Sequence, residues 1–138
     1  MRTLHPRARV IEAFRRTYGA KPEFLVRAPG RVNLIGEHID YNGGHVLPMA
    51  IDFGIWIALR PRPDDQVHVM SLDFEDSDVF ILSDLEKGEP GWIEYLKGVA
   101  WALQASGRRL CGWEGTIAGN VPIGAGLSSS AALEIATM

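Results

Sequence analysis

A segment rich in glycine and serine spans residues 120–132, with the sequence NVPIGAGLSSSAA. Gly124 and Gly126 allow backbone N–H groups to turn toward an anion, because glycine adopts conformations that other residues avoid. The Ala, Leu and Glu residues that follow predict a helix over 128–138. Its first turn would offer unpaired N–H groups and a positive dipole end, while its serines could cap the helix, bind phosphate oxygens or bind Mg²⁺. This segment therefore predicts a phosphate-binding loop.

Four other interpretations of residues 120–132 can be compared with the phosphate-binding loop. The segment is not a Walker loop, because no lysine follows its glycines, and it lacks the G-x-S-x-G pattern of a nucleophile elbow. The dinucleotide fingerprint is only partial, since Ser129 stands where the third glycine belongs. A serine-capped helix after a tight turn, with no ligand, remains the structural alternative.

A second polar cluster lies in residues 27–44, with the sequence RAPGRVNLIGEHIDYNGG. Arg31 offers a planar fork of donors that suits phosphate oxygens. The side chains of Glu37, His38 and Asp40 can accept hydrogen bonds from neighbouring hydroxyls of a sugar, and the histidine can also donate. Two alternatives stay open: a metal site that also includes His45, although no H-E-x-x-H pattern or cysteine partner supports it, and a solvated charged turn.

Apolar spacing and turn residues predict a mostly antiparallel sheet with helices. The turn Pro29-Gly30 is expected to separate the first two strands. The predicted helices cover residues 7–18, 93–103 and 128–138, and the predicted strands cover residues 24–28, 32–35, 46–51, 55–59, 67–70, 79–82 and 113–118.

Composition limits the class of protein. With 138 residues and 46% hydrophobic content, the chain corresponds to one globular domain over residues 1–138, which excludes disorder, coiled coil and collagen. Scattered basic residues, 14 against 17 acidic ones, do not suggest a nucleic-acid partner. The longest apolar runs, such as Ile55 to Leu59, are far shorter than the roughly 20 residues that cross a membrane. One cysteine, Cys111, and a start without a signal sequence favour the cytoplasm.

Residues 27–52 and 122–132 together resemble the two N-terminal motifs of galactokinases, in the GHMP small-molecule kinase superfamily. The later segment fits the superfamily pattern P-x-x-x-G-L-x-S-S-A-A, and GRVNLIGEHxDY at residues 30–41 is characteristic of the galactokinase branch. The resemblance implies an α+β GHMP kinase N-terminal domain, similar to ribosomal protein S5, with a sugar-binding motif over 27–52 and an ATP phosphate loop over 120–132.

The resemblance also implies an activity, the Mg²⁺-dependent transfer of the γ-phosphate of ATP to the anomeric hydroxyl of α-D-galactose. Arg31 would be the catalytic residue that stabilises the transferring phosphoryl group, and a monomer is expected. The sugar would contact Glu37, His38, Ile39 and Asp40. The ATP phosphates would contact Gly124, Ala125, Gly126, Leu127, Ser128, Ser129 and Ser130, with Ser130 also a ligand of Mg²⁺.

Three departures from the family pattern qualify this expectation. Ile39 stands where many galactokinases carry threonine and is also familiar from N-acetylgalactosamine kinases, so the preference at C2 of the sugar is open. His45 replaces a hydrophobic or aromatic residue. The catalytic aspartate, the glutamate that binds Mg²⁺ and the C-terminal domain of the family would lie beyond Met138, so a truncated chain, inactive alone, is expected. The alternatives are another GHMP sugar kinase and a non-catalytic sensor of galactose and ATP.

Overall fold

Five strands form one mixed sheet, with helices on both of its faces, in this computed structural model, which describes residues 4–138. The elements are α1 (Pro6–Tyr18), β1 (Phe24–Ile35), the 3₁₀ helix η1 (Asp40–Asn42), β2 (Leu47–Pro61), β3 (Gln66–Ser71), β4 (Asp76–Ile81), α2 (Trp92–Ala105), β5 (Trp113–Gly119) and α3 (Ser129–Thr137).

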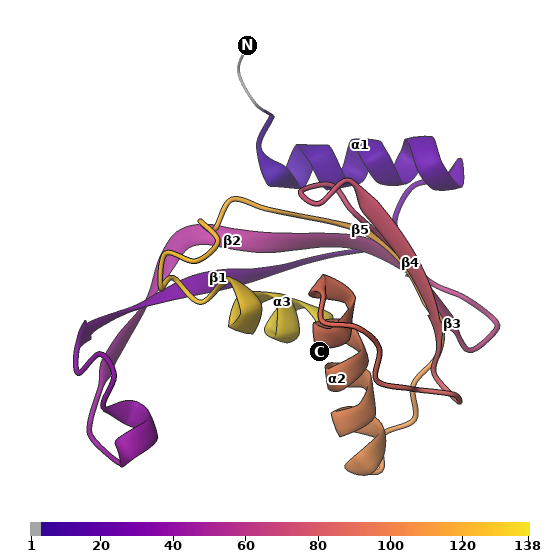
Figure 1. Ribbon diagram of the computed structural model, residues 1–138. Helices are drawn as coiled ribbons and strands as arrows, with labels where there is room; N and C mark the ends of the chain where they lie inside the picture. Colours follow the sequence, from indigo (N-terminus) through magenta and orange to yellow (C-terminus); the bar gives the residue numbers. More distant parts are fainter. Residues whose placement is uncertain (1–3) are drawn as a thin grey trace.

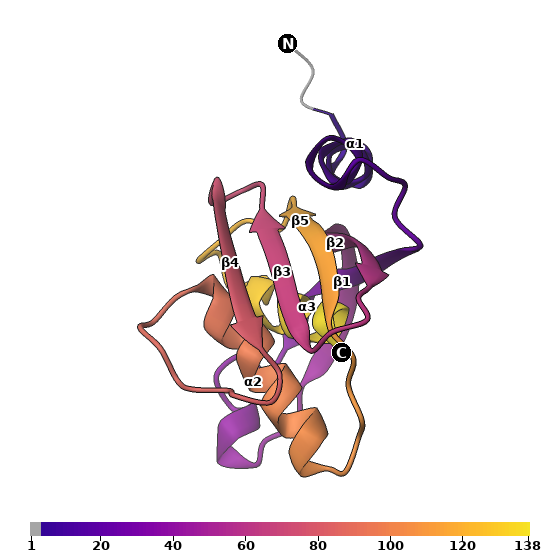
Figure 2. The same cartoon turned by 90° about the vertical axis from the view of Figure 1, so that its right-hand side faces the viewer.

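The strands are arranged in the order β1-β2-β5-β3-β4. Three neighbouring pairs are antiparallel, and only β3 and β5 run parallel. Helix α1 packs on one face of the sheet, whereas α2 and α3 lie on the other (Figures 1 and 2). The expectation of an α+β fold with a mostly antiparallel sheet is therefore confirmed.

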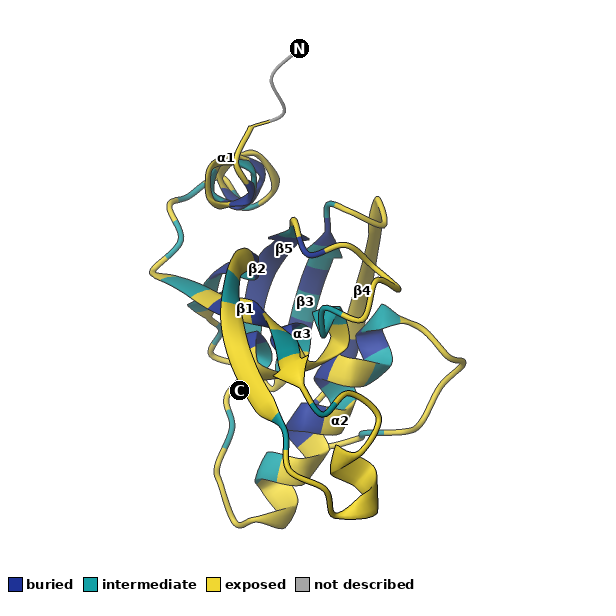
Figure 3. Cartoon of the chain, turned by 90° about the vertical axis from the view of Figure 1, so that its left-hand side faces the viewer, coloured by how far each residue is buried: buried dark blue, intermediate teal, exposed yellow. Residues whose placement is uncertain are grey.

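Side-chain alternation along the central strands supplies the core on both faces, because successive residues of a strand point to opposite sides. Ile57 belongs to the larger cluster beneath α2 and α3, together with Leu96 of α2. The next residue, Ala58, belongs to the smaller cluster beneath α1, together with Val10 and Phe14. Figure 3 shows the buried central strands and the exposed far ends of β1 and β2, where the two strands project beyond the rest of the sheet.

The helix boundaries follow the sequence signals within a few residues. Pro6 occupies the first turn of α1, where its missing N–H costs nothing. Gly19 ends the helix with a φ of 66°, a left-handed conformation that glycine adopts without steric cost. Strand β4 begins three residues before the predicted Val79.

No helix among residues 4–138 has the length and apolar character needed to span a membrane.

The predicted turn at Pro29-Gly30 is wrong, because β1 runs straight through it as one strand of 12 residues. The pairing with β2 shifts register between Pro29 and Arg31, so the structure has a bulge there. Proline is tolerated at this position because β1 is an edge strand.

The two strands predicted over 46–51 and 55–59 are likewise a single strand, β2, of 15 residues. Gly54 lies opposite Pro29, and a methyl group added at Gly54 would lie 2.7 Å from the carbonyl oxygen of Ala28. The glycine therefore permits close approach of two backbones at the bulge, and it does not interrupt the strand.

Candidate functional site

The glycine-rich loop lies across the edge strand β1. The backbone N–H of Arg31 donates a hydrogen bond to the carbonyl oxygen of Leu127 at 3.0 Å. A methyl group added at Gly30 would lie 2.8 Å from the same oxygen, so the loop approaches β1 where the strand has no side chain. Two segments separated by almost 100 residues in the sequence therefore meet at the bulge.

Glu37 extends this meeting point beyond the end of β1. A methyl group added at Gly126 would lie 3.7 Å from Oε1 of Glu37, which places this carboxylate beside the tip of the loop. Arg31 is exposed, and its guanidinium has no ion pair or hydrogen bond to any side chain among residues 4–138. The structure therefore brings the backbone of Arg31, the carboxylate of Glu37 and the 126–127 backbone together.

The rest of the sugar motif forms a tight, exposed loop between β1 and β2. The carbonyl oxygen of Ile39 accepts hydrogen bonds from the N–H groups of Asn42, at 3.2 Å, and Gly44, at 2.8 Å. His38 adopts a φ of 64°, which is uncommon for a residue other than glycine and indicates local strain. Among the described residues, no hydrogen bond or ion pair connects His38, Ile39 or Asp40 to residues 124–130.

The start of α3 keeps its backbone donors available. Ser128 is the residue before the first turn, and its side chain makes no capping hydrogen bond. Its φ of 62° is left-handed, which is uncommon for a residue other than glycine. The serine cap that the sequence suggested at this position is therefore not formed. The free N–H groups of the first turn suit an anionic ligand.

A cavity of about 420 Å³ opens beside the first turn of α3. Its aromatic lining, which includes Trp92 and Tyr95, was not among the predicted site residues. Trp92 and Tyr95 are three residues apart on α2, and this spacing, which placed them on one helix face, was the available signal. The cavity is lined by Ile55, Ser71, Asp73, Phe74, Trp92, Tyr95, Ile117, Gly119, Asn120, Val121, Ile123, Ser129, Ser130 and Leu133.

The alternative of a metal site in the sugar motif finds no support in the geometry. Within residues 4–138, no three His, Cys, Asp or Glu side chains gather closely enough to hold a metal ion. Glu37, His38, Asp40 and His45 therefore do not form a preassembled metal centre. The exposed Ser130, at the first turn of α3, remains the predicted side-chain ligand for an ion carried by a nucleotide.

Two sequence families match this chain. The family described as "Galactokinase galactose-binding signature" matches residues 12–61, which contain β1, the polar loop and β2. The family described as "GHMP kinases N terminal domain" matches residues 94–138, which contain the glycine-rich loop and α3. The chain resembles the N-terminal part of galactokinases. The two matching segments meet at Arg31 and Leu127.

Individual relatives agree with this assignment. The chain is 52% identical to the galactokinase of Roseiflexus sp. (strain RS-1) over 125 residues, which are 91% of this chain and 32% of that protein. It is 49% identical to the galactokinase of Thermococcus kodakarensis over 113 residues, 82% of this chain and 31% of that protein. The chain therefore spans about a third of the length of the curated relatives that it matches.

Solved structures give the same result for the fold. The Lactococcus lactis galactokinase complexed with galactose superposes with a TM-score of 0.84 at 38% identity, covering 92% of this chain and 34% of that one. The mevalonate kinase of Methanococcus jannaschii superposes with a TM-score of 0.68 at 26% identity. The match covers 83% of this chain and 38% of that one. The predicted GHMP kinase N-terminal fold is therefore confirmed.

Proposed function

We propose that the protein containing this chain is a galactokinase, which transfers the γ-phosphate of ATP to the anomeric hydroxyl of α-D-galactose and yields galactose 1-phosphate and ADP. The observation that carries the proposal is the contact between the two motifs: the loop that ends at α3 rests on the backbone of Arg31, beside Glu37. A nucleotide on the loop and a sugar beside Glu37 would therefore be neighbours. Phosphoryl transfer needs that proximity above all.

In this proposal the triphosphate binds residues 124–130, through the N–H groups that the uncapped start of α3 leaves free. The adjoining cavity supplies an apolar site for the adenine, where Trp92 and Tyr95 offer aromatic faces. Mg²⁺, bound through the hydroxyl of Ser130 and the phosphates, would supply neutralisation of phosphate charge.

The sugar binds in the proposal through hydroxyl groups that donate to Glu37 and Asp40, with His38 and the backbone of Ile39 completing the contacts. Arg31 places its guanidinium against the equatorial oxygens of the transferring phosphoryl group, where negative charge must be neutralised in the transition state. These residues bind, orient and neutralise charge, and none of them is assigned the removal of the proton from the sugar hydroxyl.

The test uses the protein from the complete reading frame and follows ADP release with galactose, ATP and Mg²⁺. We expect turnover with galactose, and a loss of about 10³-fold or more in kcat for Arg31→Ala, with galactose affinity retained, because the arginine acts on the transition state. Arg15→Ala, an exposed arginine on α1 across the sheet, is the control and should retain activity.

Other outcomes would redirect the assignment. Turnover with N-acetylgalactosamine or mevalonate, but not with galactose, would overturn the proposed substrate. Galactose binding without any turnover would favour a sensor.

A further inference from the structure

One carboxylate outside the two motifs holds the backbone at the entrance of the phosphate loop. Asp73 lies in the turn between β3 and β4, and its Oδ2 accepts a hydrogen bond from the N–H of Gly119 at 2.6 Å. Gly119 is the last residue of β5 and directly precedes the glycine-rich loop. We propose that Asp73, fixed by Arg9 of α1, is a positioning residue that sets the phosphate loop for ATP, an inference that rests on the proposed function.

Strand geometry explains why Gly119 needs this partner. The parallel pairing of β3 with β5 ends where Ser71 lies opposite Ile117, two residues before Gly119. The N–H of Leu72 makes the last backbone contact, to the carbonyl oxygen of Ile117 at 2.9 Å. Beyond that point the edge of β5 has no strand beside it, so the carboxylate of Asp73 replaces the missing strand as acceptor. A hydrogen bond to a charged acceptor is stronger than the backbone bond that it replaces.

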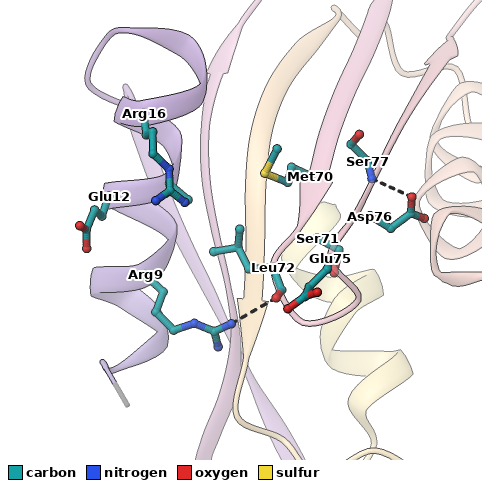
Figure 4. A pocket seen from close by; sticks show the side chains of 10 residues that line it. Arg9, Glu12, Arg16, Met70, Ser71, Leu72, Glu75, Asp76 and Ser77 are labelled. Atoms are coloured by element: carbon teal, nitrogen blue, oxygen red, sulfur yellow. Dashed lines mark hydrogen bonds between the residues drawn. The ribbon is translucent and has the colours of Figure 1, made fainter. Parts of the chain in front are cut away.

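Arg9 binds the carboxylate of Asp73 from the face of the sheet that α1 covers, opposite α2 and α3. Its guanidinium pairs with Oδ1 of Asp73 at 2.9 Å and donates to the carbonyl oxygen of Leu72 at 3.4 Å. Figure 4 shows Arg9 reaching from α1 to this turn along a cavity of about 460 Å³. Both side chains are only about a quarter exposed, at 27% and 29%, so water screens the pair less than it would a pair on the open surface. Glu75, two residues on, has a φ of 52°, which marks a strained and specific turn.

The pair therefore joins the two sides of the sheet. Arg9 lines the cavity under α1, whereas Asp73 lines the cavity that contains Ser129 and Ser130. The residue after Gly119 is held independently, because Asn120 exchanges two hydrogen bonds with Gly54, at 2.8 Å and 3.2 Å. With the Asp73 carboxylate bound on one side and Gly54 of β2 on the other, the start of the loop is fixed in direction. Loss of the Asp73 contact would release the edge of β5 at Gly119, which lines the proposed nucleotide cavity.

The experiment compares Asp73→Ala, Asp73→Asn and Arg9→Ala in the protein from the complete reading frame. For Asp73→Ala we expect the KM and the calorimetric Kd for ATP to rise about tenfold, the factor expected for one charge-assisted hydrogen bond, with the KM for galactose unchanged. Asp73→Asn keeps an oxygen acceptor for Gly119 and should restore most of the ATP affinity. Arg9→Ala should raise the KM and the Kd for ATP by an intermediate factor, because the Asp73 carboxylate loses its ion pair with Arg9.

Controls and a direct readout separate positioning from general stability. Arg16→Ala removes a cation from the same helix and cavity, and Asp78→Ala removes an exposed carboxylate from β4; both should leave ATP affinity unchanged. Hydrogen exchange at the Gly119 amide should accelerate at least tenfold in Asp73→Ala and remain slow in Asp73→Asn.

Three results would overturn the inference: unchanged ATP affinity in Asp73→Ala, unchanged exchange at Gly119, or an equal rise in KM for both substrates. A wild-type protein that binds ATP without turning over galactose would refute the proposed function alone. The ATP Kd and the exchange rate at Gly119 would then still decide the role of Asp73.

Discussion

Substitution of Gly30 by alanine tests whether the phosphate loop rests on the edge strand. The φ of Gly30 lies outside the left-handed region, so alanine meets no backbone strain there. The added methyl group would instead lie 2.8 Å from the carbonyl oxygen of Leu127 and 3.1 Å from Cδ1 of Ile51. Overpacking of this kind costs about 1–3 kcal/mol, and loss of the bond from the Arg31 N–H to Leu127 adds about 1 kcal/mol.

Because the loop is largely exposed and can move away, we expect the lower part of that sum, about 2 kcal/mol, as lost stability. The displaced loop should also lower ATP affinity by at least about tenfold. Urea unfolding and ATP-dependent ADP release measure the two effects. Gly98→Ala is the control, because this exposed helical glycine has nothing within 4 Å of an added methyl group and should gain about 0.5–1 kcal/mol. Wild-type stability together with wild-type ATP kinetics in Gly30→Ala would refute the contact between the two motifs.

Two further predictions concern the scaffold. The hydroxyl of Thr116, which is fully buried in β5, donates to the carbonyl oxygen of Val10 at 2.8 Å, so Thr116→Val should lower the free energy of unfolding by about 1 kcal/mol. Urea unfolding measures this loss. Thr116→Ser keeps the hydroxyl and its hydrogen bond to Val10, so it should not lose the stability that this bond contributes. Hydrogen bonds from Arg62 lower the pKa of Asp64 from 3.8 to about 2, so its contribution to stability is complete above pH 4 and is lost as the pH falls toward 2. Asp64→Asn should therefore weaken the loss of stability over that window, and parallel pH profiles of wild type and variant would contradict the assignment.

The parts of the fold that local chemistry determines could be predicted from the sequence. Helix α1 begins at a proline and ends at a glycine, and both signals act within one turn of the chain. The polar loop and the glycine-rich loop could also be identified, because a phosphate cradle needs backbone freedom and free N–H groups in one short segment. The functional assignment depended on these two local patterns.

The aromatic lining of the cavity beside α3 could not be predicted, because it combines residues from separate elements. Phe74 belongs to the β3–β4 turn and Trp92 to α2, and they share a cavity only after the sheet has formed. The proposed role of Asp73 could not be predicted from the sequence for the same reason. Its partners, Arg9 and Gly119, are 64 and 46 residues away in the sequence, and a lone aspartate in a turn ordinarily indicates only a turn.

The error at Pro29-Gly30 has a more general cause. Proline and glycine together usually indicate a reversal of the chain, because one fixes φ and the other adopts conformations closed to other residues. At this site neither property is used: the proline lies on an edge strand that needs no donor, and the glycine is required only for its missing side chain. The same absence permits Leu127 to reach the backbone of Arg31. A dipeptide that looks like a turn therefore acts as the contact surface between the sugar motif and the phosphate loop, and its constraint comes from a partner almost 100 residues away.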